Sequence, residues 1–520
     1  MTIDNTIKAA ADQIASLFAE KLGGIIPAHH VKTRPDGHFL IFEFAKEHDR
    51  FHSVLESVNR SLGEDHIFFD RCVIAERIRK PSEVLSMPET RLLQKAISES
   101  LTIDRYSFQD DFFGRYTTSV THFEEQITSS GNFIVFGRRG AGKSSLLAYA
   151  MHVLKRKALP YAWVAMQTYS SRSDDQTICS VISEVLDAIK QYVNETDELD
   201  ALIRKFEDLA ESDSSSLVQK IDRLIPKVRK SIQLISKPEF PFTIFLDDFH
   251  VLNESLQPRL LAALYSATRG NNANIKISGI EQFTRAWDEV AKQGLQSGHD
   301  ARVLKLDLNL TMPDRSKTHI VGILNAHAQY CGLPSIYYLT SDEVLSRLVL
   351  VAAAVPRDAL NLFTQAINKA YIREQKSVSL TSINMAASEM AEGKLADMEK
   401  DTTEKLDDVN AVLSLIKDFC ITKQRKNSFL VKIENGDATY RNVQKLVALR
   451  LVHVLHEGIT PHEAGQRFMA LMLDYGFYVG IRAAKSVNLF PTEPQALTAK
   501  DLRKLPIFNQ KLPLLQKAVA

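Results

Sequence analysis

Residues 132–144 read NFIVFGRRGAGKS, an apolar run typical of a strand followed by a glycine-rich loop. The loop, from Gly137 to Ser144, satisfies the pattern GxxxxGK[ST] at every fixed position. A segment typical of a helix, SLLAYAMHVLKRK, follows it. This order of strand, loop and helix is the one that a phosphate-binding loop requires. We therefore expect a nucleoside triphosphate site here, and a glycine-rich turn that binds nothing is the disfavoured alternative.

The residue types in this loop suit contact with phosphate. Glycine lets backbone N–H groups approach phosphate oxygens closely and permits positive φ angles. Lys143 is expected to contact the β- and γ-phosphates, and the Ser144 hydroxyl to coordinate Mg²⁺. Ser145 has no necessary role, and Arg138 and Arg139 face either a neighbouring subunit or solvent. The predicted nucleotide-binding loop residues are Gly137, Arg138, Arg139, Gly140, Ala141, Gly142, Lys143, Ser144 and Ser145.

A second motif lies about a hundred residues downstream, where FTIFLDD at 242–248 is an apolar run that ends in two acids. A buried strand of a parallel sheet delivers its terminal residues to the ligand-binding edge. Asp247 is expected to hold the Mg²⁺ ion, and Asp248 to polarise the attacking water. The alternative is that these two acids lie in a solvated turn, and the presence of the phosphate-loop motif argues against it.

The segment from about 105 to 310 alternates strand-type runs with helical runs, as a parallel α/β sheet does. We therefore predict the α/β fold class, with a P-loop parallel-sheet core. A mostly helical insertion is expected over roughly 176–236, with a polar loop at 211–216. The predicted strands are 132–137, 161–169, 242–248, 274–280 and 302–308.

Composition excludes several classes of protein. Of the 520 residues, 45% are hydrophobic and 24% charged, which argues against wholesale disorder. The 64 basic and 63 acidic residues nearly cancel, so a nucleic-acid site must come from local asymmetry. The four cysteines form no CxxC pair, which suits a reducing compartment without structural zinc. The longest apolar stretch, near 348–355, is too short to cross a bilayer, so we expect a cytoplasmic protein without membrane contact.

Further motifs resemble a known family. FGR at 113–115, ahead of the phosphate loop, resembles the FxGR box that approaches the adenine in AAA+ and STAND-type ATPases. The resemblance implies that Gly114 and Arg115 belong to the nucleotide site. It also implies that Ser278, in the strand after the acidic pair, is the polar residue called sensor 1 and takes part in catalysis.

The segment VPRDAL at 355–360 resembles the sensor 2 segment in the helical lid of the origin-recognition (replication-initiator) group. The resemblance implies that the Arg357 guanidinium contacts the γ-phosphate and couples lid closure to the triphosphate. A surface arginine paired with Asp358 or a nearby acid is the alternative. Over roughly 105–395, the resemblance implies ATP and Mg²⁺ as cofactors and an ATPase activity.

The chain departs from the family pattern at several positions. Asp248 stands where fast AAA+ motors have a glutamate, so its carboxylate is one methylene shorter. Ala354 stands where the group often keeps a glycine or a polar residue. No arginine finger is assigned, and Arg285 and Arg302 are candidates only. These departures favour a slow, ATP-controlled switch over a processive motor.

Four domains are expected: a small α+β domain of unreadable role at 1–95, the P-loop core at 105–310, a helical lid at 311–395 and a basic block at 409–520. Residues 421–520 carry 15 Lys and Arg against 7 Asp and Glu, a local asymmetry suited to a phosphate backbone.

The basic block resembles the winged-helix domain that follows the lid in origin-recognition-type ATPases. Its helix YRNVQKLVALR is the candidate recognition helix, and Arg441, Lys445 and Arg450 are the candidate phosphate contacts with DNA or RNA. A winged helix that only packs against protein is an equal alternative.

The leading hypothesis is an ATP-binding, slowly hydrolysing regulator that assembles on DNA or on a partner protein, as a homo-oligomer or with that partner. Such switches serve replication, transposition or anti-phage defence, and the sequence does not choose among these roles. The alternative is a protein-interaction scaffold in which ATP is structural and the terminal blocks recruit a separate effector.

Overall fold

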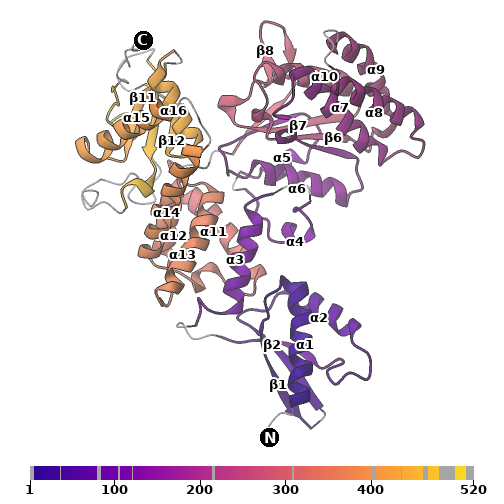
Figure 1. Ribbon diagram of the computed structural model, residues 1–520, viewed down its shortest axis with the longest axis vertical. Coiled ribbons are helices and arrows are strands. Elements are labelled where there is room, and N and C mark those ends of the chain that lie inside the picture. Colours follow the sequence, from indigo (N-terminus) through magenta and orange to yellow (C-terminus); the bar gives the residue numbers. More distant parts are fainter. Residues whose placement is uncertain are drawn as a thin grey trace. The chain divides into compact units, whose positions relative to one another are not determined.

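The computed structural model divides the chain into two compact units, which are described separately (Figure 1). One unit spans Ile103–Asp307, and the other combines Met1–Thr102 with Leu308–Ala520. The structure describes residues 5–35, 37–78, 83–103, 106–119, 121–212, 217–306, 308, 310–400, 406–434, 436–460, 466–479 and 498–510. No helix among these residues is both long enough and apolar enough to span a membrane.

The unit Ile103–Asp307 is built on a five-stranded sheet in the order β10-β4-β7-β6-β5. Every neighbouring pair of strands is parallel. The P-loop α/β core predicted from the sequence is therefore confirmed. Its strands are β4 (Phe133–Phe136), β5 (Tyr161–Ala165), β6 (Phe242–Asp247), β7 (Ala273–Gly279) and β10 (Arg302–Lys305).

The second strand is shorter than its apolar run suggested. Pairing between β5 and β6 ends where Ala165 meets Asp247. The chain then turns into a short 3-10 helix, Met166–Tyr169, in place of the predicted strand end. This turn brings the residues after β5 to the edge where the acidic pair lies.

Helices cover both faces of the sheet because side chains along its strands alternate between two cores. Ile134, Val164 and Ile244 face a core shared with the helices α7 to α10, whereas Phe133 and Val135 face a core shared with α6. Figure 1 shows the two layers of helices on opposite faces of the strands. The helices are α4 (Asp110–Phe113), α5 (Phe123–Ile127), α6 (Lys143–Arg156), α7 (Asp174–Lys190), α8 (Asp197–Ala210), α9 (Leu217–Ile235) and α10 (Leu256–Thr268).

The helices α8 and α9 are the insertion expected before the strand that carries the acidic pair. The polar loop predicted at 211–216 begins with a turn after α8, and residues 213–216 lie outside the described part of the chain. A small hairpin of β8 (Trp287–Asp288) and β9 (Gln293–Gly294) follows β7.

The second unit begins with an α+β segment, as predicted. In its three-stranded sheet β2 pairs antiparallel with β1 and parallel with β3. Leu40, Phe42 and Phe44 alternate on the face that packs against the helices. The elements are α1 (Asn5–Leu22), β1 (Ala28–Arg34), β2 (Gly37–Phe44), α2 (Asp49–Ser61), β3 (Cys72–Glu76) and α3 (Pro88–Ser100).

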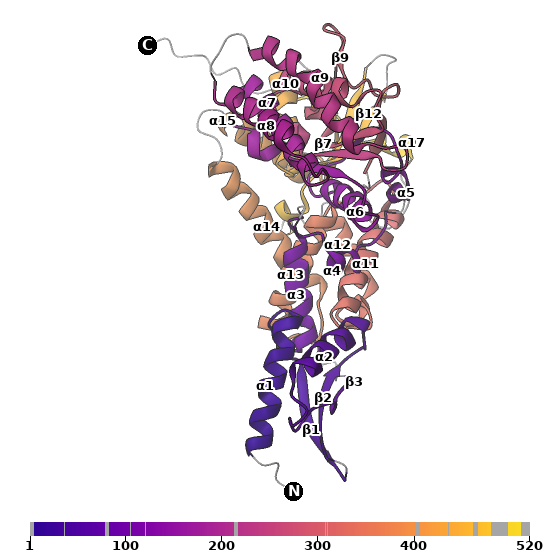
Figure 2. The ribbon, with the colours of Figure 1, turned by 90° about the vertical axis from the view of Figure 1, so that its right-hand side faces the viewer.

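A helical block and a small antiparallel sheet complete this unit. Figure 2 shows α3 beside α13 of the helical block, a pair in contact. The C-terminal sheet has the order β11-β13-β12. Its candidate recognition helix ends at Ala448, two residues before the end of the predicted segment at Arg450. The elements are α11 (Pro313–Tyr330), α12 (Asp342–Val351), α13 (Pro356–Ile372), α14 (Leu380–Lys400), α15 (Leu406–Lys417), β11 (Ser428–Lys432), α16 (Ala438–Ala448), β12 (Val452–Ile459), β13 (Phe468–Leu473) and α17 (Ala499–Leu502).

Candidate nucleotide site

The glycine-rich loop connects the end of β4 to the first residue of α6, Lys143. Gly140 and Gly142 have φ angles of +82° and +95°, a conformation that favours glycine. At Gly137, an added Cβ atom would lie 3.1 Å from Leu306 Cβ and 3.3 Å from Ala141 Cβ. Of the three glycines in the loop, Gly140 and Gly142 are therefore favoured by backbone conformation and Gly137 by the small space around it.

Lys143 is buried at the start of α6, with 5% of its surface exposed. Its ammonium group donates a hydrogen bond to the Arg138 carbonyl oxygen over 3.0 Å, within the loop. A buried cation inside a loop of backbone N–H groups, at a helix N-terminus, creates a site of positive potential. This geometry is suited to phosphate groups.

Three side chains from separate elements meet at the carboxyl end of the sheet. The Ser144 hydroxyl donates to Asp247 Oδ1 over 3.0 Å, and the Ser278 hydroxyl donates to the same oxygen over 2.5 Å. The Ser278 hydroxyl also accepts a hydrogen bond from the Asp248 N–H over 2.9 Å. The phosphate loop, the acidic pair and the candidate sensor thus share one hydrogen-bonded network.

The residues at this point fit a magnesium ion. Asp247 and Ser144 supply a carboxylate and a hydroxyl oxygen, which are ligand types that Mg²⁺ uses. Burial, followed by the charge of Asp248, raises the pKa of Asp247, whereas the hydrogen bonds from Ser278 and Ser144 oppose the rise. A divalent cation would stabilise the charged form of this buried carboxylate. Within the described ranges, no three His, Cys, Asp or Glu side chains form a metal cluster, and Mg²⁺ in nucleotide sites needs only one or two carboxylates.

Asp248 lies beside Asp247 but is held differently. Its φ angle is +56°, and its Oδ2 accepts a hydrogen bond from the Gln167 amide over 2.7 Å. On the other side, His250 Nδ1 lies 3.9 Å from Asp248 Oδ1. The Asp248 carboxylate is 27% exposed and therefore accessible from the site, and its hydrogen bond with Gln167 sets its orientation.

His250 is a buried imidazole next to this carboxylate, with 8% of its side chain exposed. Neither ring nitrogen has a hydrogen-bond partner among the residues that the structure describes. Burial, together with the charges of Lys143 and Arg139, lowers the pKa of His250 to about 4, although the charge of Asp248 opposes the shift. The ring is therefore neutral at neutral pH.

The sequence prediction did not include Gln167 or His250. His250 follows the acidic pair by two positions, and Gln167 follows the strand that neighbours β6. Because the carboxyl ends of parallel strands meet at one edge, both residues could have been selected as candidates from the strand assignment.

The FGR segment packs against the helix that begins with Lys143. The Phe113 ring lies 4.7 Å from the His152 ring and 5.4 Å from the Tyr149 ring, both of α6. Gly114 caps α4, and Arg115 is buried with its guanidinium over the Phe112 ring at 5.2 Å. Gly114 and Arg115 thus directly follow a residue that packs against α6, the helix after the phosphate loop.

The candidate arginine fingers lie elsewhere in this unit. Arg285 forms an ion pair with Asp288 at 3.3 Å. Arg302 begins β10 and is paired with Phe133, the first residue of β4. Because the phosphate loop follows the last residue of β4, Arg302 lies at the opposite end of the strands from that loop.

Arg357 belongs to the second unit, where it is exposed in the first turn of α13. Ala354, just before this helix, has a φ angle of +61°, the conformation that suits the glycine often found there in the resembling group. The next residue, Asp358, is buried and forms an ion pair with Arg450.

Arg441 and Lys445 are exposed on α16, as the predicted phosphate contacts require. Arg450 differs, since it follows the helix with a φ angle of +60° and its guanidinium donates to the Asp358 carboxylate. Of the basic residues counted in the C-terminal block, Arg482, Lys485, Lys511 and Lys517 lie outside the described residues.

Residues 113–276 match the family model described as an AAA ATPase domain. No curated protein matches the chain. Solved structures similar to it include the Aeropyrum pernix ORC1 protein in complex with DNA, at 13% identity over 74% of this chain and 96% of that chain, with a TM-score of 0.42. Others are Drosophila ORC bound to DNA, at 12% identity over 84% and 99% of the two chains (TM-score 0.37), and Cdc6p from Pyrobaculum aerophilum, at 12% identity over 72% and 94% (TM-score 0.34).

Proposed function

We propose that this chain, which contains an AAA ATPase domain at residues 113–276, is a slow, regulatory ATPase that uses ATP as a switch for assembly on DNA or on a partner protein. The observation that carries the proposal is the contact between the Ser144 hydroxyl and the Asp247 carboxylate at 3.0 Å, next to the buried Lys143. That contact unites the phosphate loop and the acidic strand in one site for Mg²⁺ and a triphosphate.

Each residue of the site has a role in this proposal. The loop N–H groups and Lys143 bind the phosphates, and Ser144 and Asp247 hold the cation. Bound Mg²⁺ supplies neutralisation of the charge that develops on the phosphate oxygens. Ser278 orients Asp247 and fixes the backbone of Asp248, while Asp248 accepts a proton from the attacking water.

A slow rate is supported by how Asp248 is held. Its side chain is one methylene shorter than glutamate, and the Gln167 amide occupies one of its oxygens at 2.7 Å. A carboxylate that must leave this hydrogen bond to reach water is a weaker base for catalysis. Arg357 in the helical lid remains our proposed sensor of the γ-phosphate.

A buried charge network supports communication between the lid helices and the C-terminal block. Burial alone would raise the pKa of Asp474, but the Lys394 ammonium and His453 hold that pKa well below its usual value. Lys394 Nζ lies 2.7 Å from Asp474 Oδ2 and 4.0 Å from Asp358 Oδ2. Since Asp358 follows Arg357, a movement of α13 would be transmitted to the basic block.

We further propose that the C-terminal block is a winged helix that contacts DNA through Arg441 and Lys445, and that the assembly is oligomeric. A cytoplasmic location and roles in replication, transposition or defence remain part of this proposal.

The scaffold with structural ATP is the second candidate, favoured by the Gln167–Asp248 hydrogen bond because that bond competes with hydrolysis.

The mass of the full-length protein, measured with and without Mg–ATP and duplex DNA, tests the proposal. A switch gives a larger species that needs ATP, together with DNA-stimulated hydrolysis that is lost in Lys143→Ala. Retained ATP without turnover or DNA binding would favour the scaffold instead.

A further inference from the structure

His250 lies in a short 3-10 helix, Phe249–Val251, that directly follows the acidic pair. Two contacts hold this turn in place. The Phe249 side chain is fully buried in the core of the ATPase unit, and the Val251 N–H donates a hydrogen bond to the Asp248 carbonyl oxygen over 3.1 Å. The backbone therefore keeps the His250 ring beside Asp248.

The ring is buried without a hydrogen-bond partner. Only 8% of the His250 side chain is exposed, and neither ring nitrogen makes a hydrogen bond within the described part of the chain. Its Nδ1 atom lies 3.9 Å from Asp248 Oδ1, which is beyond hydrogen-bond distance. Because a buried polar group without a partner is unfavourable, a small shift of the carboxylate toward Nδ1 would stabilise the ring.

A packing role does not explain an imidazole at this position. An apolar side chain of similar size would fill the same space and would bury no unpaired nitrogen. The choice of histidine therefore indicates that one of its nitrogens is used, and the neighbouring acceptor is the carboxylate that we propose as the base.

The charge state of the ring suits contact with a base. Burial and the charges of Lys143 and Arg139 hold the pKa of His250 well below its usual value, so the ring is neutral at neutral pH. A neutral imidazole still has one N–H donor. It can orient a carboxylate without adding a positive charge, which would lower the pKa of that carboxylate and weaken it as a base.

Asp248 lies between two donors. Its Oδ2 accepts a hydrogen bond from the Gln167 amide over 2.7 Å, whereas its Oδ1 faces His250. Hydrogen bonds that act in catalysis are often long in the absence of substrate and shorten in the complex with it. The distance of 3.9 Å is therefore suited to a contact that forms when nucleotide binds.

We propose that His250 is a positioning residue for ATP hydrolysis, whose Nδ1–H donates a hydrogen bond to the Asp248 carboxylate in the nucleotide complex and orients it toward the attacking water. The inference rests on the proposed function in that Asp248 is the base, and it adds a second residue to that step. The proton of the water passes to Asp248, and the ring only holds the carboxylate.

Two substitutions separate the N–H donor from the shape of the ring. His250→Phe keeps a ring of similar size without a donor, and His250→Leu serves where phenylalanine does not fold. His250→Asn loses the ring but places an amide N–H near the position of Nδ1. Hydrolysis at saturating Mg–ATP gives kcat, a fluorescent ATP analogue gives the affinity, and unfolding midpoints verify that each full-length variant folds.

We expect His250→Phe to lower kcat by about tenfold or more, and His250→Asn to stay within about threefold of the wild type, because the lost hydrogen bond is to a charged group. The affinity for the analogue stays unchanged in both. A packing role gives the opposite order, with His250→Phe faster than His250→Asn. That order, or a wild-type kcat in His250→Phe, overturns the inference.

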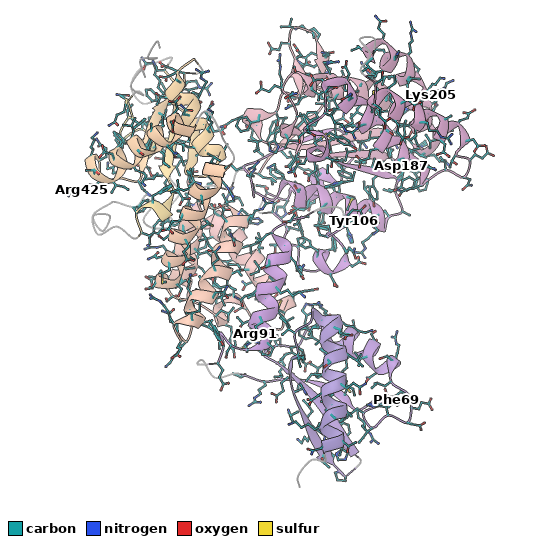
Figure 3. All side chains as sticks on the ribbon, viewed as in Figure 1. Phe69, Arg91, Tyr106, Asp187, Lys205 and Arg425 are labelled. Atoms are coloured by element: carbon teal, nitrogen blue, oxygen red, sulfur yellow. The ribbon has the colours of Figure 1, made fainter. Side chains whose placement is uncertain are left out.

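Two exposed residues of the same unit serve as controls and should keep the kcat of the wild type. His299→Phe repeats the substitution at a histidine whose side chain is 81% exposed. Lys205→Gln changes an exposed charge on α8 (Figure 3).

A double variant tests whether the ring acts through Asp248. With Asp248→Asn already present, His250→Phe should lower kcat no further, because residues that act as a unit are not additive. A further fall of about tenfold would give the ring a separate role and contradict the inference.

The two proposals fail in different ways. A slow Asp248→Asn variant together with a His250→Phe variant of wild-type kcat contradicts the His250 inference alone. A wild-type protein that binds Mg–ATP without turnover, or an Asp248→Asn variant that is as fast as the wild type, contradicts the proposed catalytic role of Asp248 and the inference with it.

Discussion

The Ser144 hydroxyl donates a hydrogen bond to the Asp247 carboxylate over 3.0 Å, although 103 positions separate the two residues in the chain. The contact joins the first turn of α6 to the last residue of β6. It exists because a parallel sheet gathers the carboxyl ends of its strands at one edge, where the loop after β4 also lies.

Asp248→Asn should bind Mg–ATP with unchanged affinity and lower kcat for hydrolysis by about 100-fold or more, because the amide cannot accept the proton of water. Single-turnover hydrolysis and nucleotide titration measure the two effects. Glu254→Gln, an exposed acid nearby, is the control and keeps full activity. If Asp248→Asn hydrolysed ATP at the wild-type rate, a residue other than Asp248 would have to accept the proton of the attacking water.

Ser278→Ala removes the hydroxyl that donates to Asp247 and accepts from the Asp248 N–H. A hydrogen bond to a charged group contributes about 1.5–3 kcal/mol, so we expect kcat to fall by about tenfold or more. Ser145→Ala in the same experiment should leave kcat near the wild-type value. Equal kcat values for the two variants would show that the network does not position the acidic pair.

Lys276 gives a prediction about pH. It lies on β7 and its ammonium donates to the Ser129 carbonyl oxygen over 2.9 Å and to the Ile127 carbonyl oxygen. Burial lowers the pKa of Lys276 from 10.5 to about 7. Between pH 7 and 10.5 the unfolded chain thus binds the proton more fully than the folded chain, so this residue makes the free energy of unfolding rise with pH.

Urea unfolding at several pH values from 7 to 10 measures this contribution. Relative to that of Lys276→Met, the free energy of unfolding of the wild type should rise by up to about 1.4 kcal/mol per pH unit between pH 7 and 10. Lys305→Met, which removes a half-exposed lysine, should keep the slope of the wild type. Identical slopes for the wild type and Lys276→Met would mean that Lys276 is charged in the folded protein.

Arg450→Gln separates a structural role from a role in DNA binding. Its guanidinium donates a hydrogen bond to the buried, charged Asp358 carboxylate, so we expect the loss of roughly 1.5–3 kcal/mol in the free energy of unfolding of this unit. Arg441→Gln, on the exposed face of α16, should change that free energy by less than about 0.5 kcal/mol. Denaturant unfolding measures both, and equal stability of the two variants would contradict the structural role of Arg450.

The sequence predicted the parallel core well because its strands are buried on both faces and appear as short apolar runs. For the same reason, the sequence places Asp247 and Asp248 at the end of a strand, whereas Ser278 comes from the family resemblance. The contacts of Gln167 with Asp248 and of Arg450 with Asp358 join distant segments through polar side chains. No local periodicity encodes such pairs, so only the folded chain identifies them.

Calorimetric titration of Mg–ATP into the folded wild-type protein tests the central claim most directly. We predict a heat of association with one site per chain, reduced when Mg²⁺ is chelated and abolished in Lys143→Ala. A folded wild-type protein that shows no heat at millimolar Mg–ATP, or a Lys143→Ala variant that binds it equally well, would contradict the nucleotide site described above.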